Sequence, residues 1–283
     1  MRRSVGHLAR RRAALACALA LGAGPLAAQT GAADTVPRST RPFFTRSDAI
    51  TLGAFTLATI AITPADRWLA EQSQNPRTQT NRIFRRSAQI VGNVAAPGSI
   101  IIGGTLYAAG RLAGNERMAS LGLHGTEAVL IGLGTVSLGK VVAGRARPYV
   151  TADTNARDFK LMRGLRGTNY QSFPSGHTVM AFAAAAAVTG ETARWWPDAT
   201  PYIGTALYGG AALAGLSRMY DNKHWASDVL VGAAIGTVVG QKVVRYHRTH
   251  PENRVDRWFL AGSLVPAPSG RWLLKLGALP GMD

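Results

Sequence analysis

The chain has 283 residues, of which 47% are hydrophobic and 17% charged, and its formal net charge is +17. This length can bury one large core, and the arginines are scattered instead of forming a basic stripe with aromatics, which argues against nucleic-acid binding. The positive charge suits an anionic substrate or an anionic membrane surface, although an arginine-rich genome would produce the same balance.

Residues 1–28 have the composition of an export signal. Five arginines lie within the first twelve residues, an apolar run covers residues 13–23, and small residues before Gln29 offer a cleavage site. The single cysteine, Cys17, lies inside this leader, so the mature chain would contain no disulfide and no thiolate metal site. We expect export to the cell envelope, either as a periplasmic domain or as an inner-membrane protein whose site faces the periplasm.

Apolar stretches rich in Ala, Leu, Val and Gly fill most of the remaining chain. After an irregular lead-in at residues 29–46, Ser47 and Asp48 can cap a helix that Pro64 ends, and residues 71–81 are loop-like. Further helices are expected at residues 82–94, 98–113, 117–144, 175–196, 201–219 and 224–247. The pattern predicts an all-α bundle of about six core helices in a domain spanning residues 47–250, with glycines allowing close helix packing.

Residues 251–283 differ in character and form a C-terminal extension. Two short apolar segments, residues 258–265 and 271–276, flank Pro266-Ala267-Pro268-Ser269-Gly270. This pattern is typical of a short β-hairpin.

The lengths of the apolar runs bear on whether the helices cross a membrane. Most uninterrupted runs cover about 12 to 16 residues, fewer than the roughly 20 that a span requires. The arginines also do not favour alternate loops, as the positive-inside rule would require. These patterns favour an exported helical domain that rests on the membrane or is partly embedded in it, with membrane-spanning helices as the alternative.

Lys140 and Arg147 form the first of three polar clusters. They lie seven residues apart, nearly two helical turns, so on one helix both side chains would point the same way before Pro148 ends that helix. Lysine offers a point charge, and arginine offers a fork that can bind two phosphate oxygens. Taken alone, the pair fits a solvated basic helix end better than a binding site.

The second cluster, Pro174-Ser175-Gly176-His177, precedes an alanine-rich helix. Backbone N–H groups at the start of that helix, with the Ser175 hydroxyl, form a natural oxyanion site, and Gly176 lets an oxygen approach the main chain closely. His177 could donate a proton to a leaving group. An ordinary N-cap serine followed by a surface histidine would explain the tetrapeptide equally well.

The third cluster contains Arg218, His224 and Asp228. If they are helical, His224 and Asp228 share a face, so the carboxylate can hold one imidazole N–H and leave the other nitrogen free to attack. Arg218 adds a third cation for a transferring phosphoryl group. A surface His–Asp pair is the simpler interpretation of this segment alone, but the ordinary explanations of all three clusters would have to hold together.

Together the clusters resemble the three signature motifs of the type 2 phosphatidic acid phosphatase (PAP2) superfamily, which includes bacterial acid phosphatases and vanadium haloperoxidases. The matched motifs are Lys140-x6-Arg147-Pro148, Pro174-Ser175-Gly176-His177 and Ser217-Arg218-x5-His224-x3-Asp228. The resemblance implies a helix bundle with metal-independent phosphatase activity. Its substrates would be phosphomonoesters or pyrophosphates, most readily lipid phosphates, and its intermediate a phosphohistidine.

The resemblance also implies roles for the matched residues. His224 would be the nucleophile, oriented by Asp228, and His177 would protonate the leaving alcohol and then activate water. The groups that would bind the phosphate oxygens are Lys140, Arg147, Ser175, Gly176 and Arg218. No metal or other cofactor is implied, because cations and a helix N-terminus do the electrostatic work. The expected partners are a phosphorylated lipid or small molecule and a membrane surface, with no protein partner evident.

Three other functions stay open at this point. They are a non-specific periplasmic acid phosphatase acting on soluble phosphomonoesters, a vanadium-dependent haloperoxidase, and a non-catalytic envelope helix bundle. The compact chain argues against the haloperoxidase, and the complete set of motif side chains argues against the non-catalytic protein.

Polar residues outside the motifs are assigned ordinary roles. We expect Lys223 to pack or to face solvent and Arg145 to be a solvated neighbour of the first motif. His124 and Glu127 are expected to face another helix, and His247 has no visible role.

Overall fold

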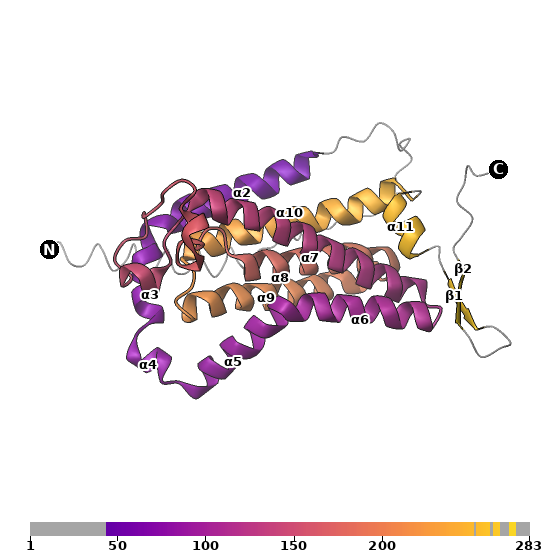
Figure 1. Ribbon diagram of the computed structural model, residues 1–283, viewed down its shortest axis with the longest axis horizontal. Coiled ribbons are helices and arrows are strands. Elements are labelled where there is room, and N and C mark those ends of the chain that lie inside the picture. Colours follow the sequence, from indigo (N-terminus) through magenta and orange to yellow (C-terminus); the bar gives the residue numbers. More distant parts are fainter. Residues whose placement is uncertain (1–43, 252, 261–262, 267–271, 276–283) are drawn as a thin grey trace.

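The computed structural model describes residues 44–251, 253–260, 263–266 and 272–275. Over these ranges the chain is mostly helical, which confirms the all-α prediction (Figure 1). The predicted export signal at residues 1–28 and most of the predicted lead-in lie outside the described residues.

The bundle is built from ten α-helices within the described ranges. They are α2 (Arg46–Ile62), α3 (Asp66–Ser73), α4 (Pro76–Gln79), α5 (Arg82–Asn93), α6 (Ser99–Leu112), α7 (Glu116–Ala143), α8 (Gly176–Trp195), α9 (Thr200–Tyr220), α10 (Ala226–Thr249) and α11 (Arg254–Phe259). The six helices predicted after residue 81 agree with α5–α10 to within two residues at each end. The region predicted as a loop, residues 71–81, instead contains the end of α3 and the short α4, which Asn75 caps ahead of Pro76.

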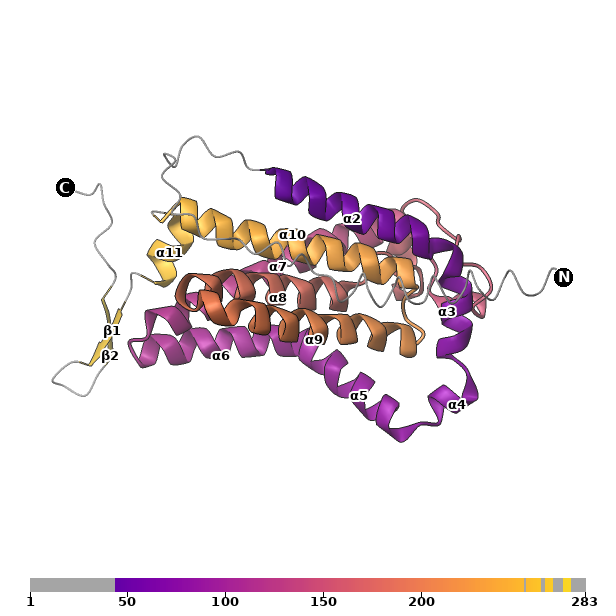
Figure 2. The ribbon, with the colours of Figure 1, turned by 180° about the vertical axis from the view of Figure 1, so that it is seen from behind.

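Helices α7, α8 and α10 lie side by side along the long axis of the molecule (Figures 1 and 2). Helix α6 runs along α7, α9 along α8, and α2 along α10, while α4 and α5 diverge from the body of the bundle. The long connection between α7 and α8 gathers at one end of the bundle, and α11 lies at the other end. Residues at one end of the central helices are therefore far from residues at the other end.

Close packing of α10 on α8 depends on three glycines spaced four residues apart: Gly232, Gly236 and Gly240. A Cβ atom at these positions would lie 2.7, 2.4 and 2.4 Å from carbonyl oxygens of α8 or of the residue that caps it. Those oxygens belong to Ser175, Val179 and Ala183. Small residues at one helix face let two backbones approach closely, and here they bring the starts of α8 and α10 together.

The C-terminal extension begins with helix and continues as strand. β1 (Ser263–Pro266) pairs antiparallel with β2 (Trp272–Lys275), in the region where a hairpin was expected. The first strand starts later than predicted, because Asn253 accepts a hydrogen bond from the backbone N–H of Asp256 and so caps α11 over the preceding residues.

Four stretches are long and apolar enough to cross a membrane: Arg46–Ser73, Arg82–Leu112, Glu116–Ala143 and Ala226–Thr249. Large apolar side chains on them are exposed, among them Leu57 (70%), Ile83 (73%) and Leu138 (72%). Apolar faces of this kind suit lipid better than water. The chain thus has the character of a membrane protein. The uninterrupted apolar runs in the sequence underestimated the length of the apolar helices, because Gly, Ser and Thr interrupt the runs without making the helices polar.

Candidate active site

A cavity of about 290 Å³ opens at the end of the bundle where α7 and α9 finish and α8 and α10 begin. Eight residues line it: Lys140, Arg147, Tyr149, Thr168, His177, Arg218, Lys223 and His224. The fold thus brings side chains from all three sequence clusters to one place. The other motif residues, Ser175, Gly176 and Asp228, are buried behind the wall of the cavity.

Lys140 and Arg147 reach the cavity from different elements, whereas the spacing had predicted one helix. α7 ends at Ala143 because Gly144 adopts a left-handed conformation with φ of 52°. A Cβ atom at Gly144 would lie 2.0 Å from the carbonyl oxygen of Lys160, so only glycine fits there. The helix stop is therefore Gly144 and not the proline that follows Arg147.

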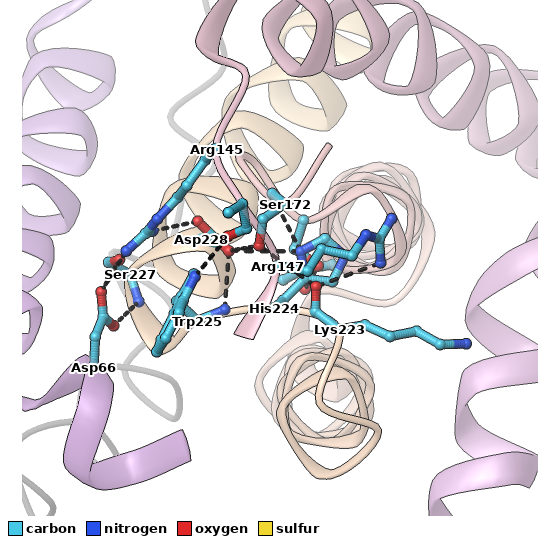
Figure 3. A network of polar contacts seen from close by, with 12 residues as sticks. Asp66, Arg145, Arg147, Ser172, Lys223, His224, Trp225, Ser227 and Asp228 are labelled. Atoms are coloured by element: carbon cyan, nitrogen blue, oxygen red, sulfur yellow. Dashed lines mark hydrogen bonds and ion pairs between the residues drawn. The ribbon is translucent and has the colours of Figure 1, made fainter. Parts of the chain in front are cut away.

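Arg147 is held by carbonyl oxygens. Its backbone is extended (φ −71°, ψ 155°), as expected before Pro148, which begins a short 3₁₀ helix, η4 (Pro148–Thr151). The Arg147 Nε–H donates to the carbonyl oxygen of Thr168 at 2.8 Å, and a terminal N–H donates to that of Lys223 at 3.4 Å (Figure 3). Two donors are used to orient the guanidinium, and the others remain for a ligand.

The second motif forms the start of α8. Ser175 is the N-cap residue; its hydroxyl accepts a hydrogen bond from Thr178 at 2.8 Å, and its backbone N–H donates to the carbonyl of Asp228 at 3.1 Å. Gly176 lies under the amine of Lys140, since a Cβ atom there would be 3.3 Å from Nζ. His177 follows at the cavity wall, within the first turn of α8, where backbone N–H groups have no intrahelical partner.

The His224 ring is oriented by a main-chain carbonyl and not directly by Asp228. Its Nδ1 lies 2.6 Å from the carbonyl oxygen of Ser172 but 3.7 Å from the nearest Asp228 oxygen. Because α10 begins only at Ala226, His224 precedes the helix instead of lying on its face as expected. A carbonyl oxygen can only accept a hydrogen bond, so Nδ1 carries the hydrogen and Nε2 keeps its lone pair.

Asp228 is fully buried and is bonded on every side (Figure 3). It accepts from the Ser172 hydroxyl at 2.5 Å and from the backbone N–H of Trp225 at 2.9 Å, and it is paired with Arg145. Through Ser172 it fixes the segment whose carbonyl holds His224. Asp228 thus acts on the imidazole mainly through its neighbours.

Arg145 is buried, with 2% of its side chain exposed, and is not the solvated neighbour that we expected. It bridges Asp228 on α10 and Asp66 on α3, the second at 2.8 Å, and a third bond joins it to the hydroxyl of Ser227 at 2.8 Å. Asp66 in turn accepts from the backbone N–H of Ser227 at 2.8 Å. This network fastens the third motif to a part of the chain far away in sequence.

Positive charge dominates the cavity, and no carboxylate is among the residues that line it. Burial, followed by the charge of Arg147, lowers the pKa of Arg218, and burial followed by Arg218 and Arg147 lowers the pKa of Lys223. Cations that repel one another in this way are stabilised by an anion placed between them.

Arg218 keeps a donor available for such an anion. One end of its guanidinium is paired with Asp221, and Gly92 of α5 lies against it, since a Cβ atom there would be 3.4 Å from Nη2. Its buried Nε–H has no hydrogen-bond partner within the described part of the chain. A buried donor left without a partner is costly, and a phosphate oxygen in the cavity would satisfy it.

Both imidazoles of the cavity are neutral at pH 7. Burial lowers the pKa of His224 to about 4, with Asp228 opposing the shift. Burial, then the charge of Arg218 and other cations, lowers the pKa of His177 to about 3. A bound anion would offset those cations, so His177 would take up a proton more readily with phosphate in place.

Several participants were not found by sequence reasoning. Lys223, assigned to packing or solvent, lines the cavity together with Tyr149 and Thr168. Ser172 and Asp66 escaped notice because a carbonyl group and a distant aspartate carry no local sequence pattern.

Comparison with known proteins indicates a family for the part of the chain that forms this site. Residues 122–252, which contain the three motifs, match the PAP2 superfamily. This part of the chain is thus similar to the PAP2 superfamily. The resemblance drawn from the motifs is therefore confirmed.

Two further comparisons are informative. Over 108 residues the chain is 39% identical to the lipid A 1-phosphatase of Porphyromonas gingivalis; this match covers 38% of the chain but only 20% of that protein. The chain thus matches about a fifth of the length of this curated relative. Its fold is similar to the crystal structure of a transmembrane PAP2-type phosphatidylglycerolphosphate phosphatase from Bacillus subtilis. That comparison gives a TM-score of 0.50 at 19% identity and covers 74% of this chain and 99% of that one.

Proposed function

We propose that the protein is a membrane-bound phosphatase of lipid phosphates, which works without a metal through a phosphohistidine on His224, in a catalytic unit formed by residues 47–250. One observation carries the proposal: a neutral imidazole with a free Nε2 lies in a cavity lined by four cations and a second imidazole. Such a cavity stabilises the charge of a transferring phosphoryl group and offers it a nucleophile.

In the first step, Nε2 of His224 attacks phosphorus, so a P–N bond forms as the P–O bond to the alcohol breaks. His177, protonated once the anion is bound, gives its proton to the leaving oxygen. The equatorial oxygens are neutralised by Lys140, Arg147 and Arg218, whose Nε–H is free to donate. Gly176 leaves room for Lys140 to approach the phosphate, and the start of α8 adds its positive end.

In the second step, the neutral His177 takes a proton from water, and the resulting hydroxide attacks phosphorus. The P–N bond breaks, His224 regains its lone pair, and inorganic phosphate leaves. The two steps use His177 in opposite proton states, which requires its pKa to respond to the bound anion.

Two observations support a lipid phosphate as substrate. The two proteins that the chain resembles are named for lipid phosphates, lipid A and phosphatidylglycerolphosphate. The cavity lies at the end of α7 and at the start of α10, both long and apolar enough to span a membrane. A lipid head group at the membrane surface could therefore enter while its chains stay in the bilayer. From the predicted export signal at residues 1–28, we infer that the site faces the periplasm.

The test is phosphate release by purified protein in detergent, with a chelator present, from phosphatidate and from a soluble phenyl phosphate. We expect lipid turnover, no turnover by the His224→Ala variant, and normal turnover by His250→Ala, which removes an exposed histidine away from the cavity. The phosphoenzyme of the wild type should survive alkaline quenching and be lost on acid quenching, because a phosphohistidine is labile in acid.

The remaining functions give different results in the same experiment. Turnover of the soluble ester alone would indicate a non-specific acid phosphatase. Dye halogenation with vanadate and peroxide would indicate a haloperoxidase. Unimpaired turnover by His224→Ala would overturn the nucleophile.

A further inference from the structure

A second polar cluster lies at the opposite end of the bundle from the cavity. Three of its side chains, His124 on α7, His247 on α10 and Asp256 on α11, place one potential ligand atom each within 4.8 Å of the others. Both histidines are buried, with 3% and 1% of their side chains exposed. Along α8, the cluster's neighbour Glu191 lies 14 residues after His177, or about 21 Å away. The cluster thus takes no part in the proposed phosphatase chemistry.

The oxygen Oδ1 of Asp256 lies at the centre of the cluster. It is 3.0 Å from Nε2 of His124 and 2.9 Å from Nδ1 of His247. Donor atoms around a tetrahedral zinc ion lie roughly 3.3 Å apart. The two distances to Asp256 are close to this value, and the two imidazole nitrogens lie within 4.8 Å of each other.

Each imidazole is held from behind by a glutamate. Nδ1 of His124 lies 2.9 Å from Glu191, and Nε2 of His247 lies 2.7 Å from Glu127. Metal-binding histidines usually donate their second N–H to a carboxylate in this way, which fixes the tautomer and turns the lone pair toward the ion. Both rings therefore present the nitrogen that faces Asp256.

Each imidazole can offer one lone pair to an ion. A neutral imidazole has one N–H, so when this N–H is donated to the glutamate, the other nitrogen keeps its lone pair. In His124 that nitrogen is Nε2, and in His247 it is Nδ1, which also lies 3.1 Å from Nδ2 of Asn253. The two rings are stacked with their centroids 3.9 Å apart, so both lone pairs are within reach of a single divalent cation beside Asp256.

We propose that His124, His247 and Asp256 bind a divalent transition-metal ion of the zinc class, which joins α7, α10 and α11. Two imidazole nitrogens and one carboxylate oxygen are the donors that zinc and cobalt accept, with a fourth position left for water. Asn253 donates to the other Asp256 oxygen at 2.7 Å and so keeps Oδ1 turned toward the rings. Ionisable residues within spanning helices α7 and α10 are costly in lipid, and an ion would give them a use.

The test is cobalt binding to the full-length protein, purified with a tag that contains no histidine and stripped with a chelator. We expect about one Co²⁺ per chain, visible d–d absorption of a four- or five-coordinate site, and a melting temperature that rises on adding metal. Two variants should weaken binding at least tenfold: His247→Ala and the near-isosteric Asp256→Asn, which keeps the shape of α11. Circular dichroism would show that both remain helical.

Two variants serve as matched controls. His250→Ala removes an exposed histidine one helical turn from the cluster, and His224→Ala removes a histidine of the cavity. Both should bind cobalt like the wild type, whatever their phosphatase activity. A wild type that retains no stoichiometric cobalt, or an Asp256→Asn variant that binds it equally well, would overturn the proposal.

Discussion

Asp228 and His224 are neighbours without a direct hydrogen bond: Nδ1 of His224 lies 3.7 Å from the nearest Asp228 oxygen, and Ser172 joins the two residues. The hydroxyl of Ser172 donates to Asp228, while its carbonyl accepts from His224. The acid of the third motif thus orients the proposed nucleophile through another residue. The hydroxyl and the carbonyl of Ser172 contact different residues, so a substitution can remove the hydroxyl and leave the carbonyl in place.

The Ser172→Ala variant removes the hydroxyl but keeps the carbonyl that holds His224. We expect the activation free energy to rise by about 1 kcal/mol because His224 is oriented less firmly, which corresponds to a several-fold lower kcat with an unchanged KM. Asp228→Asn should cost more, because it also leaves buried Arg145 short of a negative partner. Steady-state kinetics on both variants check the order. If Ser172→Ala were as damaging as Asp228→Asn, the hydroxyl would be doing more than positioning.

Arg145 should be essential for stability and not for binding phosphate. The Arg145→Met variant leaves two buried carboxylates, Asp66 and Asp228, without their cation, which costs about 3–5 kcal/mol. Thermal unfolding in detergent would show a melting temperature many degrees lower. Arg157→Met, which removes an exposed arginine of the same loop, is the control and should melt like the wild type.

Lys223 should set the pH range of turnover. It is among the cations that, after burial and Arg218, lower the pKa of His177. Removing a positive neighbour favours the imidazolium, so the His177 pKa rises in Lys223→Gln. The proton donor is then present up to higher pH, and the alkaline limb of the kcat profile moves up by roughly half a pH unit.

Lys160→Gln removes the same charge from an exposed position away from the cavity and should leave the profile in place. A shift of the alkaline limb to lower pH in Lys223→Gln would contradict this account, since it would require Lys223 to favour protonation.

Much of the fold could be predicted from the sequence, because helix limits depend on local signals. The apolar runs and their caps placed α5–α10 within two residues, and the motifs named five of the eight cavity residues. The site's internal support could not be predicted in the same way. Arg145 meets Asp66 across 79 residues, and His224 is oriented by a carbonyl, a group that every residue possesses. Such contacts exist only after the helices have packed.

The packing that assembles the site gives the last prediction. A methyl group at Gly236 would lie 2.4 Å from the backbone oxygen of Val179 and 2.8 Å from Cβ of Phe182, so α10 would have to move away from α8. Because α8 and α10 carry the proposed acid and the support of the nucleophile, Gly236→Ala should lower both the melting temperature and turnover. Overpacking of this kind costs about 1–3 kcal/mol.

Gly210→Ala on α9 is the matched control, since nothing lies within 4 Å of its Cβ position. Gly210 is exposed and lies in the middle of a helix, so there the same substitution should stabilise the protein by about 0.5–1 kcal/mol and leave turnover unchanged. Thermal unfolding and turnover measured on both variants give opposite signs if backbone contact between α8 and α10 holds the site together. Equal behaviour of the two alanine variants would mean that the helices can separate without harm.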